Sequence, residues 1–411
     1  MKSFCIFADT INVIFITLIN YYEICTRPYF LFCQERKGLL GMTWHGNILS
    51  DSCSYRELQI TTKEMEKTNI MLKNSGTPPL FSVIINVYNP GSLVADCLHS
   101  VFMQNLPQED FEVIIVDDCS TDGSIDYIDE LTRGYGNTTT LRHTRMKGRG
   151  GAYNTGMRSA RGQYIVFMDS YDYWQYSDTL SKLRKSVMDT GADIIVNTAS
   201  TEVSYTSRLS LDKYNADVAT ADAAPGAVLP THDHNRSPWN IICRRELVTG
   251  RDIWFAEYVQ HDGVDWGMRV IASSETAARI SFPYYCRRRG LGRDGHQSTG
   301  SMFDSVSCYK RLYRFAQGCD APDTRDYMAG WILRGTMSLP SLARGSAIKD
   351  SRKAVSRLRE AHLLSPSAYR ELSGRISISL RQRMVLFLLR SMPSLLLLPS
   401  LFGRKARQGM G

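Results

Sequence analysis

The chain has 411 residues, of which 43% are hydrophobic and 22% are charged. This composition is typical of a soluble globular protein, and the length is sufficient for two or three domains. It excludes a mostly disordered chain and a fibrous repeat protein. It also excludes a polytopic membrane protein, which would need several uncharged runs of about 18 residues or more.

The net charge of +8 is concentrated near the C-terminal end. Residues 341–411 contain 14 of the 49 basic side chains but only 3 of the 41 acidic ones, so the rest of the chain is nearly neutral. A basic tail predicts a polyanion or an anionic membrane surface as its neighbour. The ten cysteines form no C-x-x-C pair, which favours a reducing, cytoplasmic compartment.

Residues 1–75 show no clear periodicity. The apolar run at 4–19 is interrupted by Asp9 and Asn12, so it is too short and too polar for a membrane span, and no signal-peptide cleavage site is evident. We expect a poorly ordered N-terminal extension, with an interfacial membrane anchor as the alternative.

Strands and helices alternate from residue 79 onwards. β-branched, apolar runs predict buried strands, and apolar residues at helical spacing predict helices between them. This alternation indicates an α/β fold in which helices cover both faces of a parallel sheet. The predicted strands are 80–89, 111–118, 163–169 and 193–197, and the predicted helices include 93–102, 125–131 and 180–187.

Three of these strands end in polar or acidic residues, at 88–89, 117–118 and 169–172. The carboxyl ends of parallel strands meet at one edge of a sheet, which is where α/β proteins bind their ligands. We therefore expect the three clusters to lie together and to form a binding site.

A glycine-rich segment at 147–156 precedes or begins another helix. Backbone N–H groups at such a helix start, together with the cation of Arg149, suit a phosphate group. The sequence has neither the P-loop pattern nor the glycine pattern of dinucleotide-binding folds after its first strand.

Four segments, in this order and at this spacing, resemble family 2 glycosyltransferases: 82–89 (SVIINVYN), 116–124 (VDDCSTDGS), 150–156 (GGAYNTG) and 167–174 (FMDSYDYW). The resemblance covers roughly residues 78–300. It implies the GT-A fold, with a mixed, mostly parallel sheet flanked by helices. It also implies inverting transfer of a sugar from a nucleoside diphosphate donor, with Mn²⁺ or Mg²⁺ as the cofactor.

The resemblance also implies roles for individual residues. Tyr88 and Asp118 would bind the nucleobase, and Asn154 and Asp169 would contact the nucleotide sugar. Asp169 and Asp172 would hold the metal, whose charge would neutralise the departing diphosphate. Tyr171 stands where the family has a third acid. This puts in doubt the contact that the acid usually makes with the donor or the metal. The alternative interpretation is that these acids only cap strand ends and helix starts.

Inverting transfer needs a general base that deprotonates the acceptor hydroxyl. The segment 260–270 (QHDGVDWGMRV) resembles the family's Glu-Asp motif in altered form. Asp262 is the first candidate for the base and Asp265 the second. Either acid could instead cap the helix that follows.

A basic segment follows at 284–298. Arg287 and Arg288 are candidates for binding the donor diphosphate as part of a mobile lid, and His296 could reach the metal. The alternative is a solvated basic loop.

The remaining chain, residues 301–411, is predicted to be a basic helical region. Arginines flank the apolar segment 384–402, which arginine and two prolines interrupt. This pattern favours an interfacial membrane contact over a full span, with a C-terminal helix docked on the body as the alternative.

These patterns predict three parts: an extension at 1–75, a GT-A domain at 78–300 and a helical region at 301–411. The predicted partners are a nucleotide-sugar donor, a glycan or glycolipid acceptor and an anionic membrane surface. No nucleic-acid partner is expected, and the predicted location is the inner face of the cell membrane. The alternative functions are a catalytically inactive homologue that acts as a scaffold and a nucleotidyltransferase.

Overall fold

The computed structural model describes residues 77–218, 220–223, 237–259, 262–290, 299–319, 322–342, 348–363, 365–374, 383 and 386–387. The predictions for residues 1–75, for His296 and for most of the C-terminal apolar segment lie outside these residues. Within the described residues, no helix is both long and apolar enough to cross a membrane.

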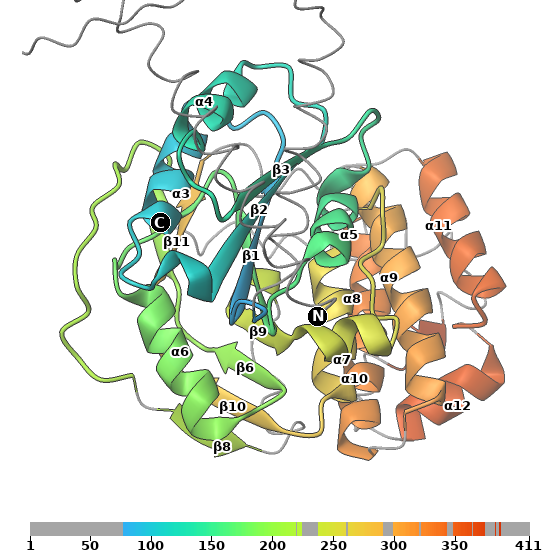
Figure 1. Ribbon diagram of the computed structural model, residues 1–411. Helices are drawn as coiled ribbons and strands as arrows, with labels where there is room; N and C mark the ends of the chain where they lie inside the picture. The colour runs from blue at the N-terminus through green and yellow to red at the C-terminus, as the bar shows by residue number, and fades with distance from the viewer. Residues whose placement is uncertain are drawn as a thin grey trace, which may run out of the picture. The chain divides into compact units, whose positions relative to one another are not determined.

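An eight-stranded sheet forms the centre of the described fold (Figure 1). Most neighbouring strands are parallel, but β9 runs antiparallel to both of its neighbours and β8 is an antiparallel edge strand. The predicted mixed, mostly parallel sheet is therefore confirmed. In spatial order the strands are β3 (Thr138–Arg142), β2 (Phe111–Asp117), β1 (Phe81–Val87), β4 (Tyr164–Asp169), β9 (Ile241–Arg244), β6 (Ile194–Asn197), β10 (Ala277–Ile280) and β8 (Thr220–Ala223).

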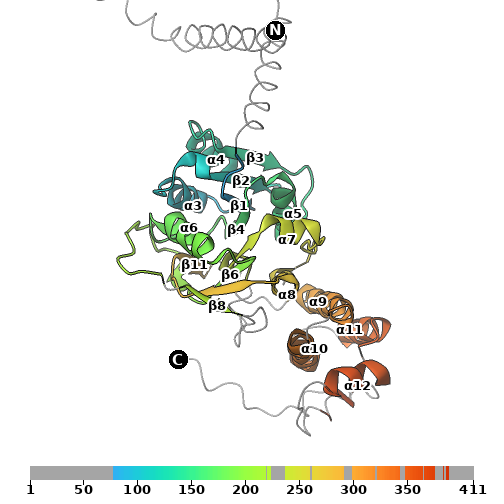
Figure 2. The same cartoon turned by 60° about the horizontal axis from the view of Figure 1, so that its bottom comes forward.

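Helices cover both faces of the sheet (Figures 1 and 2). Every residue of β1, β2 and β4 is buried, which explains why these strands read as continuous apolar runs. One face packs against α3 (Leu93–Phe102), α4 (Ser124–Leu131) and α6 (Thr179–Thr190). The other face packs against α5 (Gly148–Ser159), α7 (Arg245–Gly250) and α8 (Asp262–Ser273).

Glycine lets helix α5 approach the sheet closely. A Cβ atom on Gly156 would lie 2.3 Å from Cγ2 of Ile84 in β1. No side chain fits at that distance, so the glycine brings α5 against the strand. This contact positions the first turn of α5 beside the ends of the central strands.

A smaller sheet joins segments that are far apart in the sequence. Its order is β5 (Tyr173–Trp174), β11 (Tyr285–Arg289) and β7 (Thr201–Ser204). Because β5 begins four residues after β4 ends, its pairing with β11 brings Tyr285–Arg289 next to the acids at 169–172.

The C-terminal region is helical over its described residues, as predicted. Four helices share an apolar core, and α9 packs against α8 of the sheet domain. Helix α8 therefore contributes Met268 to this second core while Trp266 and Val270 pack on the sheet. Helix α9 begins at Thr299, and the domain boundary near residue 300 stays a prediction. The helices are α9 (Thr299–Gln317), α10 (Pro322–Leu342), α11 (Ile348–Glu360) and α12 (Pro366–Gly374).

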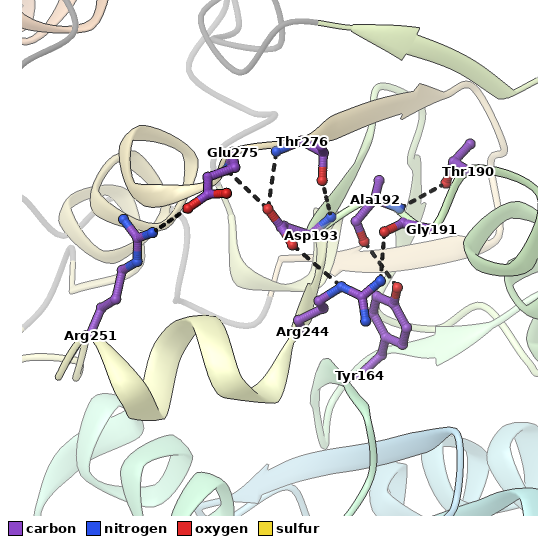
Figure 3. A network of polar contacts seen from close by, with 9 residues as sticks. All are labelled: Tyr164, Thr190, Gly191, Ala192, Asp193, Arg244, Arg251, Glu275 and Thr276. Atoms are coloured by element: carbon purple, nitrogen blue, oxygen red, sulfur yellow. Dashed lines mark hydrogen bonds and ion pairs between the residues drawn. The ribbon is translucent and has the colours of Figure 1, made fainter.

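The starts of β4, β6 and β10 and the end of β9 form what we call the amino edge of the sheet, centred on Asp193 (Figure 3). Asp193 Oδ2 accepts hydrogen bonds from the backbone N–H groups of Glu275 and Thr276, each at 3.0 Å. Its Oδ1 lies 3.3 Å from Nε of Arg244. These contacts join the chain before β6 to the chain before β10 and to β9.

Candidate functional site

Strands β1, β2 and β4 end together. The β1–β2 register sets Val87 opposite Asp117, and the β1–β4 register sets Asn86 opposite Asp169. Because both pairings are parallel, the predicted convergence of the three polar clusters is confirmed. We call this set of strand ends, residues 86–89, 117–118 and 169–172, the carboxyl edge.

Asp118 holds the first turn of α5. Asp118 is only 2% exposed, and its carboxylate accepts hydrogen bonds from the backbone N–H groups of Lys147 at 2.8 Å and Gly148 at 2.7 Å. A ring nitrogen of His143 lies 2.7 Å from Asp118 Oδ1, and the other ring nitrogen lies 2.8 Å from the Thr155 hydroxyl. Asp118 therefore caps the start of α5, as in the alternative interpretation that these acids cap strand ends and helix starts. Its contact with a nucleobase stays a prediction.

Asp169 faces the same helix. The Tyr153 hydroxyl donates to Asp169 Oδ1 at 2.8 Å, and the Asn86 amide is a further donor to that oxygen. Nη1 of Arg149 lies 3.7 Å from Oδ2. Since Tyr153 and Arg149 both belong to α5, this helix supplies a neutral donor and a cation to one carboxylate.

Asp172 points into the protein. It is 0% exposed; the backbone N–H of Arg288 donates to its Oδ1 and the Tyr285 hydroxyl to its Oδ2, each at 2.9 Å. Burial, followed by the charge of Asp172, raises the pKa of Tyr285 well above its ordinary value, so this phenol remains a hydrogen-bond donor. Asp172 therefore connects β11 to the carboxyl edge.

Tyr171 lies between these two acids in the sequence and turns towards β1. Its hydroxyl donates to the backbone carbonyls of Tyr88 and Asn89. The Tyr171 side chain thus connects two strand ends. The Tyr88 side chain is 41% exposed at this edge.

The acids of the carboxyl edge fit a divalent cation poorly. Such a cation prefers several oxygen ligands, mostly carboxylates, and the described residues contain no group of three His, Cys, Asp or Glu side chains that could hold one. Both oxygens of Asp172 accept hydrogen bonds from buried groups, and Tyr171 supplies a phenol in place of an acid. Direct metal ligation by Asp172, which stays untested, is not favoured by this geometry.

The buried position of Arg288 does not match its predicted role in a mobile lid. Its side chain is 0% exposed and ion-paired with Asp96 of α3. It donates to the carbonyl oxygens of Tyr171 at 2.8 Å and Ser207 at 2.9 Å, and its guanidinium lies 4.6 Å from the centroid of the Tyr173 ring. This guanidinium is part of the core that supports Asp172, so the structure does not favour a diphosphate contact.

Arg287 and Arg289 lie on the opposite face of β11, because side chains alternate along a strand. Both are within ion-pair distance of Glu202 on β7, Arg287 at 3.6 Å. The predicted diphosphate contact of Arg287 stays a prediction.

Asp265, the second candidate for the general base, is fully buried in α8. Its Oδ2 accepts hydrogen bonds from Arg269 of the same helix at 3.1 Å and from Arg311 of α9 at 2.7 Å. A carboxylate held by two guanidinium groups and closed to solvent is out of reach of an acceptor hydroxyl. The structure therefore favours a structural role for Asp265, as the link between α8 and α9.

Asp262, the first candidate, is the first residue of α8. A Cβ atom on the next residue, Gly263, would lie 2.7 Å from Pro238 and 3.8 Å from Nη2 of Arg149. The start of α8 therefore lies beside the same guanidinium that faces Asp169. This places the backbone of Asp262 near the carboxyl edge.

The predicted donor contact of Asn154 is also not favoured by the structure. Its amide nitrogen donates to the Phe255 carbonyl at 3.1 Å, and its amide oxygen accepts from the Phe255 N–H at 2.9 Å. Asn154 is 2% exposed, so it connects α5 to the chain ahead of α8.

Three aromatic residues of the site had no assigned role in the sequence analysis: Tyr153, Tyr285 and Trp239, the last in a 3₁₀ turn at Pro238–Asn240. The Trp239 ring stacks on Tyr285 at a centroid distance of 5.4 Å, and the Arg149 guanidinium lies 5.9 Å from its centroid. All three lie within the range of about 78–300 that the resemblance covers, but the sequence does not show that their hydroxyls and rings converge on Asp169 and Asp172.

Comparison with known proteins supports the resemblance. Residues 82–248 match the sequence profile described as glycosyl transferase family 2. The poly(ribitol-phosphate) beta-glucosyltransferase of Bacillus spizizenii is 42% identical over 93 residues, which is 22% of this chain and 15% of that protein. The putative teichuronic acid biosynthesis glycosyltransferase TuaG of Bacillus subtilis is 36% identical over 111 residues, 27% of this chain and 43% of that protein. The matches thus span less than half the length of these relatives.

The fold is also similar to solved structures. Staphylococcus aureus TarS 1–349 in complex with UDP-GlcNAc superposes with a TM-score of 0.61 at 20% sequence identity, covering 77% of this chain and 89% of that one. The same protein in complex with UDP gives the same TM-score at 19% identity. At these identities the similarity establishes the fold, which is the GT-A fold.

Proposed function

We propose that the chain transfers a sugar, with inversion, from a nucleoside diphosphate donor to a hydroxyl of a polysaccharide or lipid-linked glycan, since residues 82–248 match the profile of glycosyl transferase family 2. One observation carries this proposal: β1, β2 and β4 bring Tyr88, Asp118 and Asp169 to one edge, and Arg149 faces that edge from α5.

The proposed donor lies along the carboxyl edge. Its nucleobase stacks near the exposed ring of Tyr88, beside the turn that Asp118 holds. Its diphosphate lies near the positive end of α5 and the Arg149 guanidinium, since a helix start and a cation both stabilise phosphate. Asp118 then acts by fixing the shape of this turn as well as through any direct contact with the base.

In the proposed reaction the acceptor oxygen forms a bond to the anomeric carbon of the donor sugar. The bond from that carbon to the diphosphate oxygen breaks, and its electron pair leaves on the diphosphate. The acceptor proton moves to the carboxylate of Asp262, the general base. Attack opposite the leaving group inverts the anomeric configuration.

The family resemblance implies Mn²⁺ or Mg²⁺ at Asp169 and Asp172. The contacts of Asp172 and the phenol at Tyr171 fit such an ion poorly, so no step above passes through a metal. The negative charge that develops on the diphosphate is instead stabilised by groups of this chain.

The names of the relatives suggest the class of acceptor. The curated relatives named above act on poly(ribitol phosphate) or in teichuronic acid biosynthesis, so we propose a hydroxyl of a cell-surface polymer as the acceptor.

Such acceptors are assembled at membranes, and we propose that the basic C-terminal tail holds the enzyme at the cytoplasmic face. Deletion of residues 381–411 should release the protein from anionic vesicles, and unchanged pelleting would contradict this attachment.

A screen of nucleotide sugars tests the function directly. Incubation of the full chain with a panel of UDP-, GDP- and TDP-sugars should release nucleoside diphosphate from one donor, faster when the acceptor polymer is present. Asp262→Asn should reduce the transfer rate by about a hundredfold or more while donor affinity changes little. Tight nucleotide binding without turnover would instead indicate a catalytically inactive binding subunit.

A further inference from the structure

We propose that His143 is a positioning residue for nucleobase selectivity, because it holds the Asp118 carboxylate in the orientation that distinguishes one donor base from another. This inference rests on the proposed function, in which the nucleobase lies beside Asp118. The family resemblance implies no role for His143.

The backbone of His143 lies against the residues on both sides of Asp118. The parallel register of β2 and β3 sets Asp117 opposite Arg142. Asp118 and His143 follow these two residues, so they lie side by side where the strands end. The N–H of His143 donates to the Asp117 carbonyl at 2.9 Å, and the Cys119 thiol donates to the His143 carbonyl at 3.2 Å. These contacts fix the position of His143 independently of its ring.

The ring of His143 connects Asp118 to helix α5. Its Nδ1 lies 2.7 Å from Asp118 Oδ1, and its Nε2 lies 2.8 Å from the Thr155 hydroxyl. Because a carboxylate only accepts hydrogen bonds, the donor proton is assigned to Nδ1. In the neutral ring Nε2 then accepts from the Thr155 hydroxyl, so that both ring nitrogens have partners.

This chain of hydrogen bonds is buried and fixed at its far end. The side chains of His143 and Asp118 are 7% and 4% exposed. Thr155 precedes Gly156, the glycine that brings α5 against β1, so packing of the core holds the Thr155 end. A hydrogen bond to a buried carboxylate is stronger than one at the surface, because little water competes for it.

The donors around Asp118 fix the plane of its carboxylate. His143 and the N–H of Lys147 donate to Oδ1, whereas the N–H of Gly148 donates to Oδ2. The last torsion of an aspartate side chain is broad and roughly two-fold, so hydrogen-bond partners decide where its two oxygens lie. Without the ring of His143, the two neighbouring backbone N–H groups alone would constrain this plane less.

The position of these oxygens affects the choice of base, because stacking alone does not discriminate. The ring of Tyr88 is exposed at the same edge, and an aromatic ring can stack on any nucleobase. Hydrogen bonds do discriminate, since a ligand that lacks the matching group leaves a polar group of the site unpaired. Selectivity for the base therefore depends on Asp118, and the placement of the Asp118 oxygens depends on His143.

The experiment measures how strongly the full chain prefers one nucleoside diphosphate. Isothermal titration calorimetry gives the Kd of UDP, CDP, GDP and ADP in one buffer that contains MgCl₂. These ligands share the ribose and the diphosphate, so the ratios of their Kd values report on the base alone. We expect the wild-type chain to bind one of them at least about tenfold tighter than the next.

Two amide variants separate the two contacts of the ring. His143→Asn keeps an N–H donor at the place of Nδ1, so the Kd ratio should stay within about threefold of the wild-type ratio. His143→Gln carries its amide nitrogen at the place of Nε2 and loses the contact with Asp118, so the ratio should fall by about tenfold. His143→Phe, which has neither nitrogen, should behave like His143→Gln.

The control is His99→Gln, on the exposed side of α3, which should leave every Kd unchanged. Far-UV circular dichroism and the melting temperature check that each variant is folded. If His143 only supported the structure of the site, its loss would weaken the binding of all four nucleotides alike and leave their ratios unchanged.

The possible failures are distinguishable. Similar Kd values for all four nucleotides in the wild-type chain, or a ratio that survives His143→Gln and His143→Phe, would overturn this inference and leave the proposed function intact. A ratio that falls equally in His143→Asn and His143→Gln would overturn the assignment to the Asp118 contact. Absence of binding by every nucleoside diphosphate would overturn the proposed function and this inference together.

Discussion

The two edges of the central sheet both contain carboxylates that accept backbone N–H groups, but these carboxylates differ in burial. At the amino edge, Asp193 and Arg244 form an ion pair at 3.3 Å, with side chains 25% and 37% exposed (Figure 3). At the carboxyl edge, Asp118, Asp169 and Asp172 are buried. Their carboxylates accept hydrogen bonds from the chain's own hydroxyl and N–H groups.

This difference shows which charges the fold holds in fixed positions. Exposed ion pairs contribute about 0–1 kcal/mol, because water and salt screen them and both side chains lose freedom. A buried carboxylate instead leaves costly unpaired donors if it is removed. The carboxyl edge is therefore held by buried hydrogen bonds, whereas the amino edge is held by contacts that water can reach.

The largest effect is expected behind the carboxyl edge, at Asp265. Asp265→Ala would leave the guanidinium groups of Arg269 and Arg311 without their shared acceptor in a buried site, at a cost of about 3–5 kcal/mol in the free energy of unfolding. Urea denaturation measures this. Asp189→Ala, which removes an exposed partner of Lys185, is the control and should cost less than about 0.5 kcal/mol. Equal losses would contradict the burial argument.

Asp172→Ala should have the next largest effect. It removes the acceptor of the Tyr285 hydroxyl and of the Arg288 N–H, and two buried donors without partners cost about 2–4 kcal/mol. The melting temperature should fall whether or not divalent cations are present. A variant of normal stability that has lost only metal-dependent nucleotide binding would restore Asp172 as a metal ligand.

A smaller effect is expected from alkaline pH. Burial, and then the charge of Asp172, raises the pKa of Tyr285, and burial raises that of Tyr284. Above pH of about 10 the unfolded chain releases these protons while the folded chain keeps them, so stability is full below that pH and falls as pH rises. Tyr285→Phe should make the decline between about pH 10 and 12 shallower. An unchanged slope in urea denaturation would remove Tyr285 from this account.

The smallest effect is expected at the amino edge. Asp193→Ala removes one partly exposed ion pair and the acceptor of two backbone N–H groups that water can also reach, so the loss should be about 1 kcal/mol. Nucleotide affinity should not change. A loss as large as that of Asp172→Ala would remove the contrast between the two edges.

The sequence predicted the central strands and the carboxyl edge well. Strands β1, β2 and β4 are continuous apolar runs because helices cover both faces, and their polar ends converge because they are parallel. Strand β3 was missed, because its residues are at most partly buried at the margin of the sheet. The reversed direction of β9 was also missed, since apolar content does not report strand direction.

The sequence predicted the contacts of the site less well, for a physical reason. Asp169 and Asp172 are three residues apart, and the turn between them decides that one faces α5 while the other faces β11. In the same way, alternation along β11 places neighbouring arginines on opposite faces without indicating which one is buried. Asp265 is covered by α9, a contact between segments far apart in the sequence.

Hydrogen–deuterium exchange with and without nucleoside diphosphate tests the central claim most directly, because it reads both edges of the sheet in one measurement. The account predicts slower exchange on nucleotide binding in peptides covering 86–89, 117–121 and 147–156. It predicts no change in peptides covering 190–194 and 274–278 at the amino edge. Protection at the amino edge, or no protection at the carboxyl edge under conditions of saturating binding, would contradict it.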